Sequence, residues 1–439
     1  MPGDTDLLGA PNNTNLIKVQ EMLDDNTSIE FIRLQWIDFT ATVRTRIVTS
    51  RQALSLAAAG GTVSVASPIA SCFLIDGQFH EVNAGAKDSL VPDWSSLTVC
   101  HYQPGHAAVM CCIDQAGRGF DHCPRSILKK AEQEIRDRHG MTFKVGIETE
   151  FYLTASPAST SPVKVVQSYS STSALRTPYL VILEEAVRNI EKAGIPIWTF
   201  HAELVGGLFE LQTDPMSALK AADALIYVQE AIKSAAVKHG LHATMAPKPF
   251  DKTHGVGQHI HISLSSGEKD DSFLAGVLSS VPAISAISMP NYDSWLRRDF
   301  AGGDWVGWDV ESRTASIRKL RKAYWEFRFI DATTNTYLTL ATILGLGMGS
   351  WEKGKELKAK PMSSWPSTLD EKGRQEAGVE NAAPKDLKDA IEALRRDEAI
   401  HAVLGKEFCE RYIRYKEHEK QMMGELTLQE RRTMTMALF

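Results

Sequence analysis

Residues 145–153 read VGIETEFYL, and this stretch decides the fold. It is apolar and rich in residues that favour β-strands, yet Glu148 and Glu150 lie within it, one residue apart. Side chains on a strand alternate between two faces, so both carboxylates project from the same face. Two such charges on an otherwise buried strand are costly unless a positive group lies beside them. A divalent cation that prefers oxygen ligands, Mg²⁺ or Mn²⁺, is one solution, and an amphipathic strand with a solvated face is the other.

Three further short segments carry polar side chains in an apolar context, which favours the metal. A buried histidine is usually a satisfied core residue and a buried glutamate usually pairs with a base, but four such segments together are harder to explain in that way. Five glutamates and one histidine would form two adjoining metal sites suited to polyphosphate chemistry. The three segments are 257–264 (GQHIHISL, with His259 and His261), 325–330 (WEFRFI, with Glu326 and Arg328) and 201–211 (HAELVGGLFEL, with Glu203 and Glu210 on either side of a glycine pair).

Length and charge exclude several classes of protein. A chain of 439 residues is long enough for two or three domains and a large core. Its formal charge of −6, with no basic run, argues against a nucleic-acid partner. The first residues, MPGDTD, are acidic where a secretory signal is basic, and the apolar stretch 337–348 is too short to cross a bilayer. We therefore expect a cytoplasmic protein with no membrane partner.

The six cysteines lack the spacing of a metal finger. Two of them, Cys111 and Cys112, are adjacent and would face opposite ways in a strand. We expect all of them to be reduced core residues of a cytosolic protein. The six are Cys72, Cys100, Cys111, Cys112, Cys123 and Cys409.

Turn signals and periodicity predict a small α+β domain followed by a large one. Residues 1–14, rich in Pro, Asn, Gly and Asp, predict a loose tail. Residues 15–115 form the small domain, with a hairpin over 28–49, a helix over 51–59 and a strand near 107–114. Residues 116–439 form the large domain, whose sheet carries the polar residues. Its expected elements are helix 124–139, strand 143–153, helix 174–193, strand 196–211, helix 214–239, strand 241–246, strand 257–264, helix 271–287, a segment over 303–330, helix 335–353 and a charged helical region interrupted at 361–378.

The motifs resemble, in their order, those of the glutamine synthetase family, most closely its divergent synthetase-like members in bacteria and fungi. The resemblance runs from about residue 28 to the C-terminal region. It implies an α+β fold with a small N-terminal β-grasp domain and a large catalytic domain, whose curved, mainly antiparallel sheet is a half-barrel backed by helices. The matching motifs are LQWID at 34–38, DSLVPD at 88–93, GxExEF at 146–151, Glu203 with Glu210 and then AAD at 221–223, TMAPKP at 244–249, GQHIHISL at 257–264, SRTASIR at 312–318 and EFRxxD at 326–331.

The resemblance also implies two or more Mg²⁺ or Mn²⁺ ions in each site. One ion helps to place the carboxylate substrate, and the other grips the phosphates of ATP, which is a co-substrate. The matching ligands are Glu150, Glu203 and Glu210 for the first ion, and Glu148, His259 and Glu326 for the second.

The remaining site positions follow from the same resemblance. Each arginine among them has a plainer interpretation, a surface salt bridge. Guanidinium groups suit both phosphate and carboxylate because their planar donors match two oxygens at once. His261 and Ser263 are assigned to the nucleotide, and Arg313 and Arg318 to the transferring phosphate and the ATP tail. Arg328, Arg297 (from DSWLR at 293–297) and Gly255 are assigned to the substrate. Arg313 and Glu326 are the expected catalytic residues.

The chain departs from the ammonia-using members where they bind ammonium. In place of their Asp-Gly-Ser-Ser element, residues 68–78 keep Asp76-Gly77 without the serines. The loop 298–305, RDFAGGDW, has no clear glutamate, and whether Asp76 or Asp299 replaces the missing acids stays open. An ammonium pocket needs negative charge, so a larger amine, using the room left by Gly302 and Gly303, fits better.

Three other departures bear on the substrate. The substrate loop begins His254-Gly255 rather than with Asn, Leu208 stands where the family often has Gln, and Tyr324 stands where ammonia-using members often have Arg. These changes put in question whether glutamate is the acid substrate, although Arg328 still implies a substrate that carries a carboxylate.

We expect an ATP-dependent carboxylate–amine ligase that forms an amide, a γ-glutamyl amide or a near relative, through an acyl phosphate. The alternatives are an ordinary glutamine synthetase using ammonia, a catalytically silent structural or regulatory relative, and a guanidino kinase. Family resemblance further implies a ring-shaped homo-oligomer with each site built between two subunits.

Overall fold

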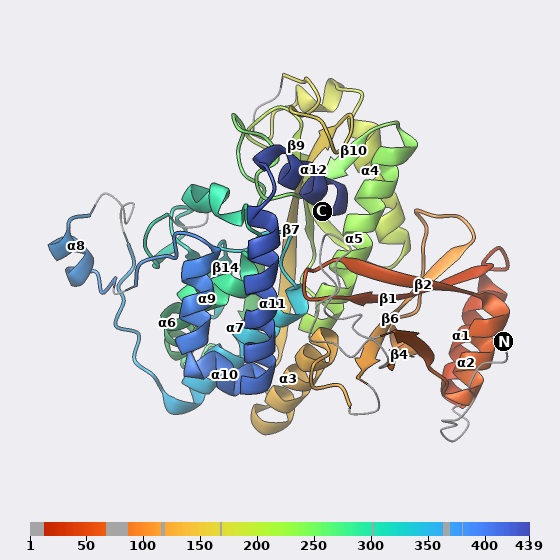
Figure 1. Cartoon of the computed structure of the whole chain (residues 1–439), viewed down its shortest axis with the longest axis horizontal. Coiled ribbons are helices and arrows are strands. Elements are labelled where there is room, and N and C mark those ends of the chain that lie inside the picture. The colour runs from red at the N-terminus through yellow and green to blue at the C-terminus, as the bar shows by residue number, and fades with distance from the viewer. Residues whose placement is uncertain are drawn as a thin grey trace.

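The computed structural model describes residues 13–66, 87–115, 119–166, 169–300, 303–362, 369–379 and 381–439. Two β-sheets organise this part of the chain (Figure 1). One has six strands and lies within residues 31–114, and the other has eight strands and lies within residues 143–327. The α+β class expected from the sequence is confirmed. The domain boundary near residue 115 stays a prediction.

The N-terminal sheet has the order β2-β1-β6-β4-β3, and β5 pairs with β6. The pair β1 and β6 is parallel and the other pairs are antiparallel. Helices α1 and α2 lie beside this sheet at one end of the molecule (Figure 1). The elements are α1 (Asn13–Asp25), β1 (Phe31–Ile37), β2 (Val43–Thr49), α2 (Ser50–Ala59), β3 (Val63–Ala66), β4 (Lys87–Pro92), η1 (Trp94–Ser96), β5 (Thr98–Val99) and β6 (His106–Asp114).

The second sheet has the order β12-β13-β14-β11-β7-β9-β8, and β10 pairs with the end of β7. Every pair is antiparallel except β12 with β13. The long strand β7 is central, which explains why its sequence is almost continuously apolar. The strands are β7 (Phe143–Thr154), β8 (Ile197–Ala202), β9 (Leu208–Thr213), β10 (His242–Thr244), β11 (Ile260–Leu264), β12 (Trp308–Val310), β13 (Ile317–Arg321) and β14 (Tyr324–Phe327).

Apolar helices pack behind this sheet and leave one face to polar residues. The ring of Phe273 in α6 stacks on Trp325 of β14 at 5.2 Å, and α6 packs along α7. Helix α7 begins where Asn335 caps the N–H of Leu338 and ends at Gly354 with φ 61°. The helices and 3₁₀ turns are α3 (Pro124–His139), η2 (Ala174–Arg176), α4 (Leu180–Lys192), α5 (Ala218–Lys238), α6 (Asp270–Ser288), η3 (Ser294–Phe300), α7 (Thr336–Lys353), α8 (Glu371–Glu376), α9 (Leu387–Arg396), α10 (Glu398–Leu404), α11 (Lys406–Gly424) and α12 (Leu428–Leu438).

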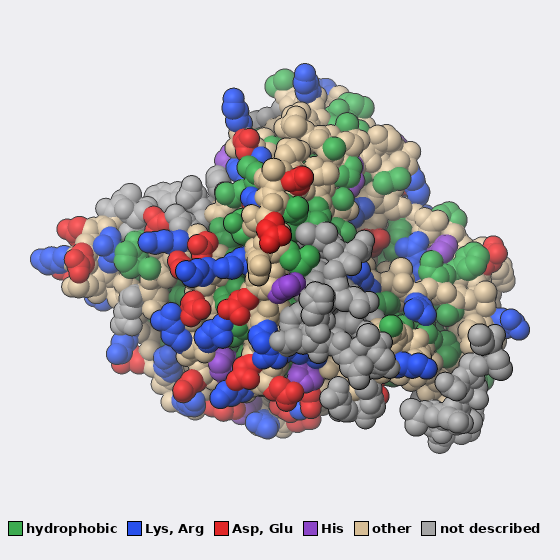
Figure 2. Space-filling model, in the orientation of Figure 1, with side chains coloured by type: hydrophobic (Ala, Val, Ile, Leu, Met, Phe, Trp, Pro, Cys, Tyr) green, Lys and Arg blue, Asp and Glu red, His purple; other side chains and the backbone are tan. Residues whose placement is uncertain are grey.

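Within the described residues, α6 is the one helix long and apolar enough to cross a bilayer by length and composition. Its apolar window is 83% buried inside the molecule, as expected of a core helix. On the face seen in Figure 2, the lysines and arginines among the described residues are mixed with aspartates and glutamates.

Both packing and charge connect the N-terminal sheet to the rest of the molecule. Phe39 follows β1 and inserts edge-on among Phe408, Tyr412 and Tyr415 of α11, with ring centroids 5.5–6.0 Å apart. The amide of Asn335 donates to the carbonyl of Asp38 at 2.9 Å, so the residue that caps α7 also holds this turn.

Arg125 of α3 makes the second connection between the two parts. It contacts Asp93, ahead of η1, at 2.9 Å and Asp223 of α5 at 2.8 Å. Asp223 also accepts from the hydroxyl of Tyr337 in α7 at 2.6 Å. Arg125 is buried, and a buried guanidinium needs such partners to offset its desolvation.

Several sequence expectations are confirmed and others are wrong. The hairpin over 28–49, the strand 143–153 and the helices at 51–59, 124–139, 271–287 and 335–353 agree with the structure to within a few residues. The expected strand 196–211 is instead the hairpin of β8 and β9, because Gly206 and Gly207 turn the chain. The tail expected over 1–14 is already helical at Asn13, and residues 1–12 lie outside the described part. The expected helix 214–239 begins at Ala218, and the strand expected over 241–246 is limited to His242–Thr244.

Candidate active site

Strand register gathers the polar side chains on one face of the second sheet. Glu150 of β7 lies opposite Glu210 of β9, and His261 of β11 lies opposite Glu326 of β14. Glu148 lies between these pairs, two residues before Glu150 on the central strand. Because residues two apart share a face, all of these groups meet above one surface of the sheet.

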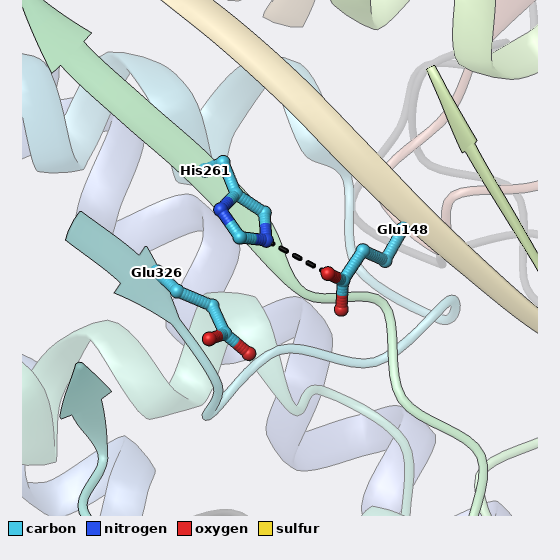
Figure 3. Close-up of side chains that lie close together, drawn as sticks. All are labelled: Glu148, His261 and Glu326. Carbon is cyan, nitrogen blue, oxygen red and sulfur yellow. Dashed lines mark hydrogen bonds and ion pairs between the residues drawn. The ribbon is translucent and has the colours of Figure 1, made fainter. Parts of the chain in front are cut away.

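Glu148, His261 and Glu326 converge from three neighbouring strands (Figure 3). Their potential ligand atoms all lie within 4.8 Å of one another. His261 Nε2 is 2.8 Å from one carboxylate oxygen of Glu148. His259 Nδ1 is 3.0 Å from the other and 3.5 Å from Glu326. The sequence placed His261 on the nucleotide, whereas the structure also brings it into the cluster around Glu148.

Both carboxylates of this cluster are held in the ionised form. Burial opposes ionisation of Glu148, but hydrogen bonds to His259 and His261 hold its pKa well below the usual range. Burial also opposes ionisation of Glu326, and the charge of Arg328 followed by that of His259 lowers its pKa. Ionised oxygens beside imidazole nitrogens are a donor set that Mg²⁺ and Mn²⁺ accept.

A second cluster lies at the β8–β9 hairpin and includes a residue not anticipated from the sequence. The ligand atoms of His201, Glu203 and Glu210 lie within 4.8 Å of one another. His201 Nε2 is 3.4 Å from Glu210, and its Nδ1 is 3.7 Å from Glu203. Glu150, the third expected ligand of the first metal, lies across the ladder from Glu210 and accepts from the N–H of Gly257 at 2.8 Å.

Charge crowding in this second cluster favours a cation. Burial raises the pKa of Glu210, and the neighbouring Glu148, Glu150 and Glu203 raise it further against the hydrogen bond to His201. Burial and then the charge of Glu150 raise the pKa of Glu203. A divalent ion would neutralise these carboxylates at neutral pH, so the residues present fit the metal that the sequence implied.

A cavity of about 380 Å³ brings these acids together with arginines. Three glutamates line one side and three arginines the other: Glu150, Glu203, Glu210, Arg297, Arg313 and Arg328. Such a mixture can bind both a carboxylate and a phosphate, since the acids hold cations and the guanidinium groups hold oxyanions.

The arginines are positioned in different ways. Arg297 of η3 is 1% exposed and donates to the carbonyl of Ile330 at 3.3 Å. Arg328 follows β14 and donates through Nη1 to Glu326. In both, the Nε–H finds no partner among the described residues, so each keeps a donor available. Arg313 is exposed at the rim.

Gly255 makes the close approach to Arg297 possible. A Cβ at this position would lie 2.5 Å from the Cβ of Arg297 and 3.1 Å from the carbonyl of Pro247. The glycine therefore belongs to the cavity wall because no larger residue fits there.

Two expected nucleotide residues lie away from this cavity lining, toward β13 and β14. Arg318 donates to Glu326 at 3.0 Å and to Glu311 at 2.8 Å. Ser263 is half-buried and pairs with Tyr324 across β11 and β14. Tyr324, one of the departures from the family pattern, lies with its hydroxyl 3.0 Å from His261 Nδ1.

The rest of the cavity wall contains less polar residues. Leu208, which is 2% exposed, and His254 line it, and both are departures from the family pattern. Tyr169 and Leu204 also line it, and no sequence signal pointed to them. The ring of Tyr169 packs edge-on against His201 at 5.4 Å. Asp76, Gly77 and Gly302 lie outside the described residues, and the side chain of Asp299 does too.

Comparison with known proteins identifies the family of the chain. Residues 121–434 match the model of the glutamine synthetase catalytic domain. The chain is 29% identical over 436 residues to Protein fluG of Emericella nidulans, covering 96% of this chain and 50% of that protein, so it spans half of that relative's length. It is 27% identical to the gamma-glutamylpolyamine synthetase GlnA3 of Streptomyces coelicolor, covering 85% of each. Other relatives at 26–28% identity include both glutamate–amine ligases and a glutamine synthetase.

A solved structure described as a GmaS/ADP complex superimposes with a TM-score of 0.81 at 24% identity, covering 94% of this chain and 98% of that one. This likeness shows the fold, with an N-terminal β-sheet domain and a curled half-barrel sheet in the catalytic part. The family model spans well over half of the chain. The chain belongs to the glutamine synthetase family.

Proposed function

We propose that this protein is an ATP-dependent ligase that joins the side-chain carboxylate of glutamate, or of a similar acid, to an amine other than ammonia. Its membership of the family supports a ligase that forms C–N bonds. The observation that carries the finer proposal is the cavity in which Glu150, Glu203 and Glu210 face three arginines beside the apolar Leu208.

The proposed reaction has two steps. A carboxylate oxygen attacks the γ-phosphorus of ATP, and the bond from this phosphorus to the β-γ bridging oxygen breaks. ADP departs, and the substrate becomes an acyl phosphate. The amine nitrogen then attacks the acyl carbon, phosphate leaves, and the nitrogen loses a proton. Mg²⁺ or Mn²⁺ bound at the two clusters would neutralise charge on the phosphate oxygens.

We assign roles to the chain's own residues from their positions. Glu148, Glu326 and His259 would hold one ion, and Glu150, Glu203 and Glu210 the other. His201 and His261 lie close enough to join or to orient these ligands.

The oxyanion-binding residues lie around the same face. Arg313, at the exposed rim, would stabilise the transferring phosphoryl group, and Arg318 and Ser263 would contact the nucleotide. Arg328 and Arg297 would hold the substrate carboxylates, with Gly255 giving them room.

The cavity wall supports an amine larger than ammonia. Leu208, Leu204 and Tyr169 give this side of the cavity apolar surface, which favours a carbon-bearing substituent. The relatives that join glutamate to isopropylamine or methylamine support the same choice.

Phosphate release from ATP tests the function. Purified protein would be assayed with Mg²⁺ and separately with Mn²⁺, using glutamate and related acids against a panel of primary amines, ammonia and hydroxylamine. We expect release that requires metal, acid and amine together, with an alkyl or polyamine substrate preferred over ammonia. Ammonia as the best nucleophile would support an ordinary glutamine synthetase instead, and ATP turnover indifferent to acid and amine would overturn the ligase.

A variant of Leu208 tests the amine specificity. Leu208→Gln introduces the side chain that the family often has at this position, and we expect kcat/KM for ammonia to rise relative to that for the preferred amine. Leu208→Met is the matched control, because it keeps the wall apolar and of similar volume. Unchanged preference in the Gln variant would show that Leu208 does not select the amine.

We also propose that the chain forms a ring-shaped homo-oligomer. This rests on the family, and light scattering after size-exclusion chromatography tests it, since a monomer would contradict a site shared between subunits.

A further inference from the structure

Two cysteine thiols lie together at the junction between the N-terminal sheet and α3, away from the active site. Cys112 lies in β6, and Cys123, just before α3, contacts the backbone directly next to it. Cys123 is 2% exposed and accepts from the N–H of Ile113 at 3.3 Å, so its sulfur is fixed in place. Cys112 is half-buried and lines a cavity of about 1090 Å³. Cys112 therefore borders the cavity, whereas Cys123 is buried.

The surroundings of Cys112 favour its thiolate. Arg125 Nη1 lies 3.6 Å from the Cys112 sulfur, and Ser126, the next residue, lines the same cavity as Cys112. Both residues lie in the first turn of the sixteen-residue helix α3, where unpaired backbone N–H groups attract negative charge. The wall of this cavity carries both signs of charge, with Lys129, Lys130, Lys406 and His122 beside Asp93, Asp121, Glu134 and Glu407, so the nearest positive group, Arg125, is the one that favours the thiolate.

The two thiols differ in their ionisation. The hydrogen bond from Cys123, then those from Ser126 and the charge of Arg125, lower the pKa of Cys112 despite its burial. Burial and the same hydrogen bond raise the pKa of Cys123. Burial also raises the pKa of Cys111, Cys100 and Cys409, which makes these three internal controls.

We propose that Cys112 and Cys123 form an oxidisable pair, with Cys112 as the nucleophile toward hydroperoxides and Cys123 as the resolving thiol. The Cys112 thiolate attacks one peroxide oxygen, the O–O bond breaks, and the departing oxygen takes a proton and leaves as water or an alcohol. The sulfenic acid on Cys112 then reacts with the Cys123 thiol, forming an S–S bond and releasing water. The peroxide is reduced by two electrons and the pair of thiols is oxidised by two.

The position of the pair gives this oxidation a structural consequence. Arg125, which holds the Cys112 sulfur, also joins Asp93 of the N-terminal part to Asp223 of α5. A disulfide removes the thiolate from this network and leaves Arg125 with its two carboxylates. The junction between the two parts of the molecule would thus respond to peroxide. This inference does not depend on the ligase activity.

Peptide mapping without reductant tests the proposal on the full-length protein. After treatment with limited hydrogen peroxide we expect a Cys112–Cys123 disulfide, a loss of two hydrogen atoms from the intact mass, and full reversal by dithiothreitol. At neutral pH, iodoacetamide should modify Cys112 about ten times faster than Cys409, because the thiolate is the reactive form. Folded protein in which Cys112 stays unmodified, or is oxidised without joining Cys123, would overturn the pair.

Serine variants separate the two roles. In Cys123→Ser the sulfenic acid on Cys112 should persist and be trapped by dimedone, whereas Cys112→Ser should show neither product. Cys111→Ser is the matched control on the same strand and should still form the disulfide. If a variant fails to fold, the mapping of the wild-type protein decides the question alone.

Discussion

The guanidinium group of Arg328 has two roles, since it pairs with Glu326 and also lines the cavity. Lysine keeps the charge but cannot present two parallel donors to a carboxylate. We expect Arg328→Lys to raise the KM for the acid substrate by about tenfold or more, equivalent to roughly 1.4 kcal/mol, with a smaller change in the KM for ATP. Steady-state phosphate release measures both constants. Arg321→Lys, on the exposed end of β13, is the control, and an unchanged KM for the acid in Arg328→Lys would remove this arginine from the substrate site.

Asp93 gives a stability prediction that depends on pH. Burial opposes its ionisation, but the hydrogen bond from Ser95 and the charge of Arg125 outweigh it and hold the pKa of Asp93 below the ordinary value of 3.8. Because the folded-state pKa is lowered, the carboxylate stabilises the fold above pH 3.8, and this contribution is lost as the pH falls through the folded-state value. Asp93→Asn keeps a capping oxygen, so it removes mainly the charge.

We expect Asp93→Asn to lower the free energy of unfolding by about 2 kcal/mol at pH 7. The difference in unfolding free energy between the variant and the wild type should become smaller as the pH is lowered below 4. Urea denaturation at several pH values measures this difference. Asp121→Asn removes an exposed carboxylate 4.0 Å from Lys130 and should change little. A constant difference at all pH values would mean that the charge of Asp93 contributes nothing.

The hairpin of β8 and β9 is the element that shapes the second metal cluster. Gly207 turns it with φ +83°, and a Cβ there would lie 2.8 Å from Pro162. We expect Gly207→Ala to destabilise the protein by about 1–2 kcal/mol, because a left-handed backbone is strained for alanine. Since Glu203 and Glu210 lie on the two arms, Mn²⁺ affinity measured by calorimetry should fall as well.

Gly349→Ala is the matched control for this element. Gly349 lies within α7 with nothing near its missing Cβ, so alanine should leave Mn²⁺ affinity unchanged and stability equal or slightly higher. A Gly207→Ala protein as stable as the wild type, with equal Mn²⁺ affinity, would contradict the proposed role of the turn.

Elements with a local cause were predictable from the sequence, and those set by long-range pairing were not. Pro124 starts α3, and an apolar run of residues that favour β-strands marks β7, so both appear where expected. His201 was visible in its segment, but its place beside Glu210 depends on how β8 pairs with β9. Tyr169 reaches the cavity from the connection between β7 and α4, and no periodic pattern indicates this. Glu148 with Glu150, His259 with His261 and Glu326 with Arg328 stand out in the sequence by their two-residue spacing, whereas the roles assigned to them rest on the resemblance to the family.

At the scale of the whole molecule, metal removal should affect both stability and activity. Glu203 and Glu210 have raised pKa values because they are buried among like charges, so a bound cation should stabilise the folded chain. We expect EDTA to abolish ADP formation and lower the melting temperature, and excess Mn²⁺ to restore both. Saturation at a hundredfold above Kd corresponds to about 2.7 kcal/mol.

Glu210→Gln separates the metal effect from a general effect of EDTA. This variant removes one of the repelling charges, so it should be more stable than the wild type in EDTA, gain less from Mn²⁺, and have little activity. An equal response to Mn²⁺ in both proteins would place the ion elsewhere.

The alternation of side chains along β7 also limits which insertions and deletions this protein can accept during evolution. Inserting or deleting one residue inside β7 or β11 would turn every downstream side chain to the opposite surface, so Glu150 or His261 would exchange places with core residues such as Thr149 or Ile262. Lengthening a connection such as that between β7 and α4 does not change which face of the sheet each side chain occupies. New substrate preferences should therefore arise through loops of varied length over a sheet whose strands keep their length.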